Sequence, residues 1–306
     1  MNIIITSIGR RVQLIEHLKE TFTVIGVDAS DCNAGRYFAD RFFMIPRCDD
    51  NKYLSELLRI AEENDVKLIL PLYEKEFAVL CDNREMFEQK GIKILLSDKE
   101  IINICNNKLA TQKFFEKEGI MAPELVNNAP AILKPVDGMG SRGVYVARTE
   151  AELEAAKTLS GNEYIIQEKI EGTEYTVDVL CDFEGNIVSV VPRIRLEVRS
   201  GEVAKSRTIN DKAVIDKTVE LIDKLNKYGK VAGPVTVQCF VTEKKEIVFI
   251  EINPRVGGGV PLTFEAGINY GDFIKKFING YVHKDGICEF KEIGMLRYDK
   301  AVYTSL

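Results

Sequence analysis

Apolar and polar positions change their spacing in a regular way over the first hundred residues. Between short apolar runs, apolar side chains recur every three or four residues, as at Val12, Ile15 and Leu18, and a last such helix extends to Lys90. The runs expected to form strands are residues 2–6, 23–27, 67–71 and 92–96. Strands that alternate with helices predict a small doubly wound α/β unit.

The next segment is expected to be helical and to lead into a different arrangement. Ser97 and Glu100 have the spacing of a capping box, which predicts a helical stretch through Lys108 to about Gly119. From Ala131 strands predominate, with one short helix that a second capping box opens at Thr149 and Glu152. We therefore divide the chain into domains at residues 1–97 and 98–306, the latter with a lid at about 125–172 and a C-terminal subdomain at about 173–306.

Near the C-terminus, an apolar strand carries a carboxylate at Glu251 and an amide at Asn253, which share one face because side chains alternate. A two-residue loop at Lys244-Lys245 would place Gln238 opposite Glu251, with Cβ atoms about 5 Å apart. Lys-Lys is an unfavoured dipeptide for such a turn, and a longer loop would move Gln238. In this register the three side chains suit a hard cation that carries a phosphate.

Composition and charge limit the classes of function. The chain has 306 residues, 45% of them hydrophobic, and a net charge of −6. An acidic chain of this kind argues against a nucleic-acid or membrane-surface protein. It has seven scattered cysteines, two histidines and no apolar run of membrane-spanning length, so we expect a cytoplasmic protein without zinc or histidine-triad chemistry. The first turn, from Thr6 to Arg11, lacks the GxGxxG spacing of a dinucleotide site.

A glycine-rich loop follows the expected strand at 131–135. Gly138, Gly140 and Gly143 occupy this loop together with Ser141 and Arg142. Such a loop is either a flexible hairpin or a phosphate cradle made of backbone N–H groups. Lys134 favours the cradle, because a lysine that ends an apolar strand is costly to bury without an anion. Lys108 is either an exposed helix lysine or a second cation.

Two further polar segments allow two interpretations each. Glu168, Lys169, Ile170 and Glu174 span a hinge between strands, which is either a solvated turn or a site where backbone groups read a base and an acid contacts ribose. A basic segment follows, and it is either a solvated strand face or a site that captures carboxylate or phosphate. Its members are Arg193, Arg195, Arg199, Lys205 and Arg207.

Taken together and in this order, these motifs resemble the ATP-grasp superfamily, and most closely its branch that is similar to carbamoyl phosphate synthase. The resemblance implies an N-terminal Rossmann-like domain, a small lid and a C-terminal antiparallel sheet. It also implies that Lys108 and Lys134 hold ATP phosphates, that Glu168 and its neighbours hold adenine, and that Glu174 holds ribose. Gln238, Glu251 and Asn253 would carry Mg²⁺ or Mn²⁺, and Arg255 would steady the transferred group.

The family chemistry implies an ADP-forming ligase that activates a small carboxylate as an acyl phosphate for attack by an amine. Carbamoyl phosphate synthesis itself is not expected, because the chain has one ATP-grasp unit and no glutaminase. Two other functions stay open, a kinase that phosphorylates a small molecule and a non-catalytic nucleotide-binding regulator. Many folds of this size pair through the α/β domain, so a homodimer is among the expected states.

Overall fold

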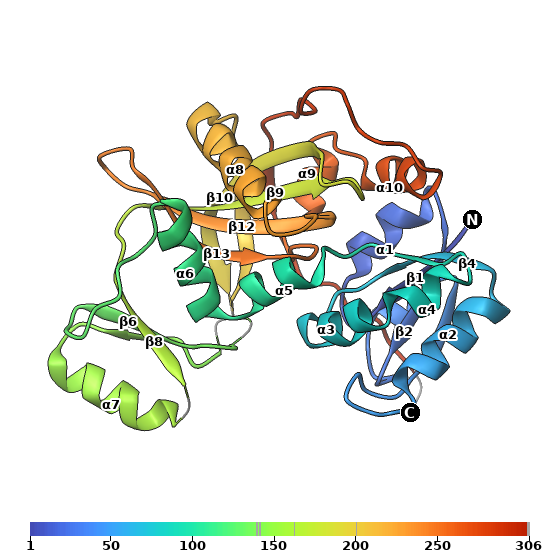
Figure 1. Cartoon of the computed structure of the whole chain (residues 1–306), viewed down its shortest axis with the longest axis horizontal. Coiled ribbons are helices and arrows are strands. Elements are labelled where there is room, and N and C mark those ends of the chain that lie inside the picture. Colours follow the sequence, from blue (N-terminus) through green and yellow to red (C-terminus); the bar gives the residue numbers. More distant parts are fainter. Residues whose placement is uncertain (139, 141, 162, 200, 305–306) are drawn as a thin grey trace.

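The computed structural model describes residues 1–138, 140, 142–161, 163–199 and 201–304. Figure 1 shows three sheets: a parallel sheet in the N-terminal unit, a small sheet with one helix at the opposite end, and a larger antiparallel sheet between them. The predicted combination of an α/β unit, a lid and an antiparallel C-terminal sheet is confirmed. No helix in these ranges has the length and apolar character that a bilayer crossing needs.

The N-terminal unit is a five-stranded parallel sheet with helices on both faces. Its elements are β1 (Asn2–Thr6), α1 (Val12–Lys19), β2 (Thr23–Asp28), the 3-10 turn η1 (Gly35–Tyr37), β3 (Arg41–Met44), α2 (Tyr53–Glu63), β4 (Val66–Leu70), α3 (Glu74–Asp82), α4 (Arg84–Glu88) and β5 (Lys93–Ile94). Ile3 and Ile5 pack in the same core cluster as α1, whereas Ile4 packs with α2, as the alternation of strand side chains requires.

The strand order of this sheet is β3-β2-β1-β4-β5. The chain runs outward from β1 to β3 and then crosses to β4 on the other side of β1. The loops after β1 and β4 therefore flank the crevice at which open α/β sheets bind ligands. β3 was not predicted from the sequence. The single helix predicted up to Lys90 is wrong, because the chain breaks at Asn83 between α3 and α4.

Two helices connect this unit to the lid, α5 (Lys99–Asn106) and α6 (Lys108–Glu118). The predicted continuous helix is wrong, because Asn107 is extended and its side chain accepts a hydrogen bond from the Ala110 N–H at 2.9 Å. The predicted capping box at Ser97 is also wrong. Its buried hydroxyl bonds instead to backbone groups of Ala232, and Asp98 is the residue before α5.

The lid is a three-stranded antiparallel sheet that packs against one helix. It contains β6 (Ala131–Pro135), β7 (Tyr145–Ala147), α7 (Glu150–Ser160) and β8 (Tyr164–Glu168), and the strand order is β7-β6-β8. The Thr149 side chain accepts a hydrogen bond from the Glu152 N–H at 3.3 Å, which confirms one half of the predicted capping box. The other half is wrong, because the Glu152 carboxylate accepts from the Arg148 N–H at 2.6 Å and not from that of Thr149.

The C-terminal part is built on a six-stranded antiparallel sheet of order β13-β12-β9-β10-β11-β14. Its elements are β9 (Thr173–Cys181), β10 (Ile187–Arg199), β11 (Glu202–Thr208), α8 (Lys212–Leu225), β12 (Gly233–Val241), β13 (Ile247–Asn253), α9 (Pro261–Glu265), α10 (Tyr270–Ile278) and β14 (Gly294–Leu296). One face is apolar, and its Val177, Val179 and Val237 share a core cluster with α8. The register places mostly polar side chains on the other face.

The β12–β13 hairpin has the predicted pairing of Gln238 with Glu251 but a different turn. The turn has three residues, Glu243 to Lys245, because the Thr242 N–H donates to the Glu246 carbonyl and the Lys245 N–H donates to the Thr242 carbonyl. This loop alone would shift the register by one residue. A β-bulge at Ile250 corrects the shift, so Gln238 still pairs with Glu251. The pairing was predicted correctly, but the two-residue turn was wrong.

Candidate active site

Three oxygen-bearing side chains lie together on the polar face of the large sheet. Gln238 pairs directly with Glu251, and Asn253 follows two residues later on the same strand. Among the described residues, no cluster of three or more His, Cys, Asp or Glu side chains could hold a metal on its own. A trio with a single carboxylate fits Mg²⁺ only if phosphate oxygens complete its shell, which is how proteins commonly bind this ion.

The first residue of α6 connects the helix to the glycine-rich loop. Lys108 Nζ donates to the Gly138 carbonyl at 2.6 Å, and the Lys108 N–H donates to the Val136 carbonyl at 3.0 Å. Gly140 and Gly143 have φ of 61° and 71°, which a side chain would strain. Arg142 is exposed, and Ser141 lies outside the described residues.

Lys134 is partly buried near the end of β6. Burial lowers the pKa of its ammonium group, Lys108 lowers it further, and Glu251 and Glu174 oppose that change. Lys134 in the lid therefore interacts electrostatically both with Lys108 on α6 and with Glu251, the proposed metal ligand. Two cations beside a single metal-ligating carboxylate leave excess positive charge, which suits a polyphosphate.

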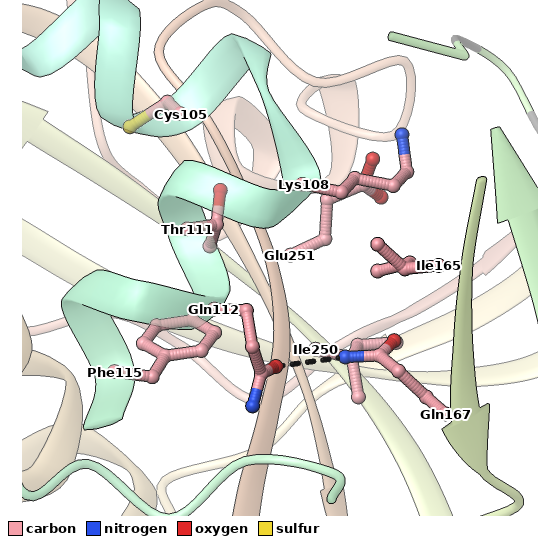
Figure 2. A pocket seen from close by; sticks show the side chains of 9 residues that line it. All are labelled: Cys105, Lys108, Thr111, Gln112, Phe115, Ile165, Gln167, Ile250 and Glu251. Carbon is pink, nitrogen blue, oxygen red and sulfur yellow. Dashed lines mark hydrogen bonds between the residues drawn. The ribbon is translucent and has the colours of Figure 1, made fainter. Parts of the chain in front are cut away.

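A narrow pocket opens between α6, β8 and β13, and Figure 2 shows Lys108 and Glu251 side by side in it. It is lined by Cys105, Lys108, Thr111, Gln112, Phe115, Ile165, Gln167, Ile250 and Glu251. Gln167 Nε2 donates to Gln112 Oε1 at 2.9 Å, which joins the lid to α6. Gln167 Oε1 is buried and has no hydrogen-bond partner among the described residues. The pocket thus offers apolar walls and an unpaired acceptor among the described residues, but its free space is only about 10 Å³, which holds roughly one water molecule.

The hinge residues have partners within the protein. Glu168 Oε1 accepts from the Glu124 N–H at 3.0 Å, and Lys169 pairs with Glu171 at 3.1 Å. Glu174 lies on the polar face and forms an ion pair with Arg195 at 2.7 Å. The backbone at Lys169 and Ile170 follows the end of β8 beside the pocket. The adenine and ribose roles of these residues remain predictions.

The basic segment divides into three environments. Arg193 is 1% exposed and makes two hydrogen bonds to Asp178, at 2.6 and 2.9 Å, so we withdraw it as a substrate contact. Arg207 pairs with Ile194 and so faces the α8 side of the sheet, away from Glu251, and we withdraw it as well. Lys205 lies two residues before Arg207 on β11 and so faces the same side of the sheet. Its side chain is half-exposed in a pair with Glu197, and we withdraw it too.

Arg195 is the member of the basic segment that the structure keeps near the site. Its side chain lies on the polar face, directly across from Glu174, and Nε is buried without a partner among the described residues. A buried donor of this kind is costly unless a ligand or water accepts from it. Arg195 therefore stays a predicted substrate contact.

Arg255 also reaches a residue that the sequence analysis did not name. Its Nε donates to Glu74 Oε1 at 3.1 Å, and both side chains are largely buried. Glu74 begins α3, directly after the β4 loop at the crevice of the parallel sheet. No local sequence signal marks this pair, because its members are far apart in the chain.

Comparisons with known proteins agree with this architecture. The family model of the ATP-grasp domain matches residues 105–259, and that of the PylC-like N-terminal domain matches residues 3–95. The ATP-grasp match alone covers just over half of the chain, so the chain belongs to the ATP-grasp family. The family resemblance predicted from the sequence is therefore confirmed.

Curated relatives are similar to the chain over much of its length. Pyruvate carboxylase of Bacillus subtilis strain 168 is 28% identical over 260 residues, which are 72% of this chain and 22% of the carboxylase. The carbamoyl phosphate synthase large chain of Pyrococcus furiosus is 28% identical over 244 residues, which are 68% of this chain and 23% of the synthase. The chain thus spans less than a quarter of the length of these relatives.

Solved structures share the fold at low identity. The N5-carboxyaminoimidazole synthetase of Staphylococcus aureus, complexed with ADP, aligns with a TM-score of 0.75 and 17% identity, covering 97% of this chain and 82% of that one. The biotin carboxylase domain of Hydrogenobacter thermophilus 2-oxoglutarate carboxylase, complexed with MgADP and bicarbonate, aligns with a TM-score of 0.75 and 17% identity, covering 94% and 72%.

Proposed function

We propose that the chain is an Mg-ATP-dependent, ADP-forming ligase that activates a carboxylate and joins it to an amine. The observation that carries the proposal is the pairing of Gln238 with Glu251 on a polar sheet face, with Lys108 in the same pocket and Lys134 within electrostatic reach. The confirmed family and the ADP complexes of its structural neighbours support the choice of nucleotide.

The residues divide the work according to their chemistry. Lys108, Lys134 and the glycine-rich loop would neutralise the phosphates, while Gln238, Glu251 and Asn253 would hold Mg²⁺, whose role is to draw charge off the phosphate oxygens. Adenine would bind at the pocket with Gln167 and Ile250 once β8 and α6 move apart to make room for it. A carboxylate oxygen of the substrate then attacks the γ-phosphorus, and the bond to the β-phosphate oxygen breaks to release ADP.

The second half of the reaction uses the acyl phosphate so formed. The amine nitrogen attacks the acyl carbon, inorganic phosphate leaves, and the amine proton passes to water. The guanidinium of Arg255 is suited to hold the acid and then the departing phosphate, because its planar fork matches both oxyanions. No histidine is needed, since this chemistry depends on position and charge neutralisation.

The test is a screen for ADP release with carboxylates crossed against amines in the presence of Mg²⁺. We expect at least one acid and amine pair to stimulate ADP release and to yield an amide and one phosphate per ADP. Glu251→Gln should abolish this release, while Glu246→Gln, on the exposed turn of the same hairpin, should not. A stable phosphorylated product without amide would indicate a kinase, and no stimulation by any pair would contradict catalysis.

A further inference from the structure

Three arginines from two parts of the chain surround one carboxylate beside the proposed site. Glu202 Oε1 lies 2.8 Å from Arg10 Nη2 and 3.7 Å from Arg11 Nη1, and Glu202 Oε2 lies 3.2 Å from Arg297 Nη1. We call Arg10, Arg11, Arg297 and Glu202 the arginine cluster. Arg10 and Arg11 follow β1, Glu202 begins β11, and Arg297 follows β14. The proposed ligase function assigns no role to any of them.

The positive charge of the arginine cluster is only partly balanced. The side chains of Arg11, Arg297 and Glu202 are 31%, 26% and 30% exposed, so water screens them incompletely. Burial lowers the pKa of Arg11, Glu202 raises it, and Arg255, Arg10 and Arg297 lower it further. Glu202 is thus the carboxylate that opposes these effects on Arg11. Half-buried guanidinium groups with such an excess are costly unless an anion joins them.

The cluster lies where a substrate of the proposed reaction would reach it. Arg10 and Arg11 lie in the loop after β1, on one side of the ligand crevice, and Glu74, the partner of Arg255, follows β4 on the other side. Arg255 also acts electrostatically on Arg11. The cluster and the arginine proposed to hold the reacting group therefore share one crevice.

The loop after Arg255 passes close to the arginine cluster. Arg297 Nη2 donates to the Gly258 carbonyl at 2.6 Å. A Cβ atom on Gly258 would lie 2.9 Å from Arg11 Nη1 and 3.6 Å from Glu202 Oε1. Glycine at this position lets the backbone approach the arginine cluster without filling the space in front of the guanidinium groups.

From these observations, and resting on the proposed ligase function, we propose that the arginine cluster binds a second, non-reacting anionic group of the acid substrate. The substrate would then be a small molecule with two anionic groups: a carboxylate that is activated near Arg255 and a carboxylate or phosphate held by Arg10, Arg11 and Arg297. Guanidinium groups bind both kinds of oxyanion through paired hydrogen bonds. Glu202 would act as an internal counter-ion that the anion competes with for the arginines.

Binding without nucleotide tests this proposal apart from the ligase reaction. Inorganic phosphate, succinate and propionate are titrated by calorimetry into the full chain and four variants, Arg11→Met, Arg297→Lys, Glu202→Gln and, as control, Arg199→Met, which changes an exposed arginine of β10. We expect both cluster arginine variants to weaken phosphate and succinate binding about tenfold, and Glu202→Gln to strengthen it, because removing the counter-ion frees two or three guanidinium groups. Arg199→Met should bind phosphate and succinate with the affinity of the parent chain. The affinity for propionate, which has one anionic group, should be the same in the parent chain and in every variant.

A purely structural role for the cluster would give a different pattern. If the arginine cluster only joins the two parts of the chain, all three cluster variants lower the melting temperature and none changes anion affinity, which would overturn the proposal. Where ADP release can be measured, the acids that stimulate it should carry two anionic groups, and Arg297→Lys should raise their KM with little change in kcat. An absence of ADP release would contradict the ligase function alone, since the anion titrations still report on the cluster.

Discussion

Arg255 Nε donates to Glu74 Oε1 at 3.1 Å, which connects the loop after β13 to the first residue of α3 in the parallel-sheet domain. We predict that Glu74→Gln lowers kcat for ADP release about tenfold, equivalent to ~1.4 kcal/mol of barrier, because Arg255 loses the charged partner that orients it. The KM for ATP should stay the same, since neither side chain lines the proposed adenine pocket.

Steady-state kinetics with the best pair from the screen provide the measurement. Glu63→Gln, which removes an exposed partner of Arg59 on α2, is the matched control and should behave like the parent chain. An unchanged kcat in Glu74→Gln, with only a lower melting temperature, would mean that the pair is structural.

Magnesium binding should depend on nucleotide. The trio of Gln238, Glu251 and Asn253 contains one carboxylate, so we expect no measurable Mg²⁺ binding at 1 mM, roughly the upper limit of a weak divalent site. With ADP present, Mg²⁺ and nucleotide should bind together. Glu251→Gln should reduce this joint affinity by about 10–100-fold, and Glu246→Gln should leave it unchanged. Calorimetric titration of Mg²⁺ with and without ADP measures this dependence. Tight binding of Mg²⁺ to the chain alone would contradict a coordination shell that protein and nucleotide share.

We expect Lys134 to lower the unfolding free energy of the protein without ligand and to be required for ATP binding. Its pKa is lowered by burial in the protein, which shows that the charged form is disfavoured there. We predict that Lys134→Met raises the unfolding free energy without ligand by about 1 kcal/mol. The same change should abolish the stabilisation that ATP provides. Lys113→Met, on the exposed side of α6, serves as control in thermal unfolding with and without MgATP. A loss of stability without ligand would show that Lys134 is well compensated inside the protein.

Glu76 should make the stability depend on pH. It is buried beneath the crevice and accepts hydrogen bonds from Thr6 at 2.5 Å and Tyr53 at 2.6 Å, yet burial raises its pKa above the usual 4.5. Because the folded state holds the proton more tightly, its stabilising contribution is complete below pH 4.5. It is lost as pH rises through the raised pKa.

Glu76→Gln should therefore gain stability relative to the parent chain as pH rises, by about 1.4 kcal/mol for each pH unit crossed within that window. Urea unfolding at several pH values between 4 and 8 measures the difference. Glu16→Gln, at an exposed position of α1, should run parallel to the parent. Parallel curves for Glu76→Gln and the parent would show that the hydrogen bonds from Thr6 and Tyr53 outweigh burial.

Local patterns sufficed for much of the fold. The apolar runs identified β1, β2 and β4, and the Thr149 cap identified the start of α7. The helices α9 and α10 were missed, and the missed strands are β3, β7, β11 and β14. These strands are short or strongly polar, and they form only because a neighbouring strand supplies their hydrogen bonds. The break at Asn107 has the same kind of origin, because Lys108 is held by the carbonyls of Val136 and Gly138 in the lid.

The order of Lys134, the glycine-rich loop, Glu251, Asn253 and Arg255 along the chain was enough to determine the family and the kind of site. Each of these signals is local, since strand alternation and glycine content act within a few residues. Tertiary structure alone decided which charges meet. The bulge at Ile250 restores the pairing of Gln238 with Glu251 after a turn that is one residue longer than predicted. Arg193 forms a buried ion pair with Asp178. Arg11 and Arg297 both form ion pairs with Glu202. Such contacts depend on sheet register and domain packing, which residues far apart in the sequence determine together.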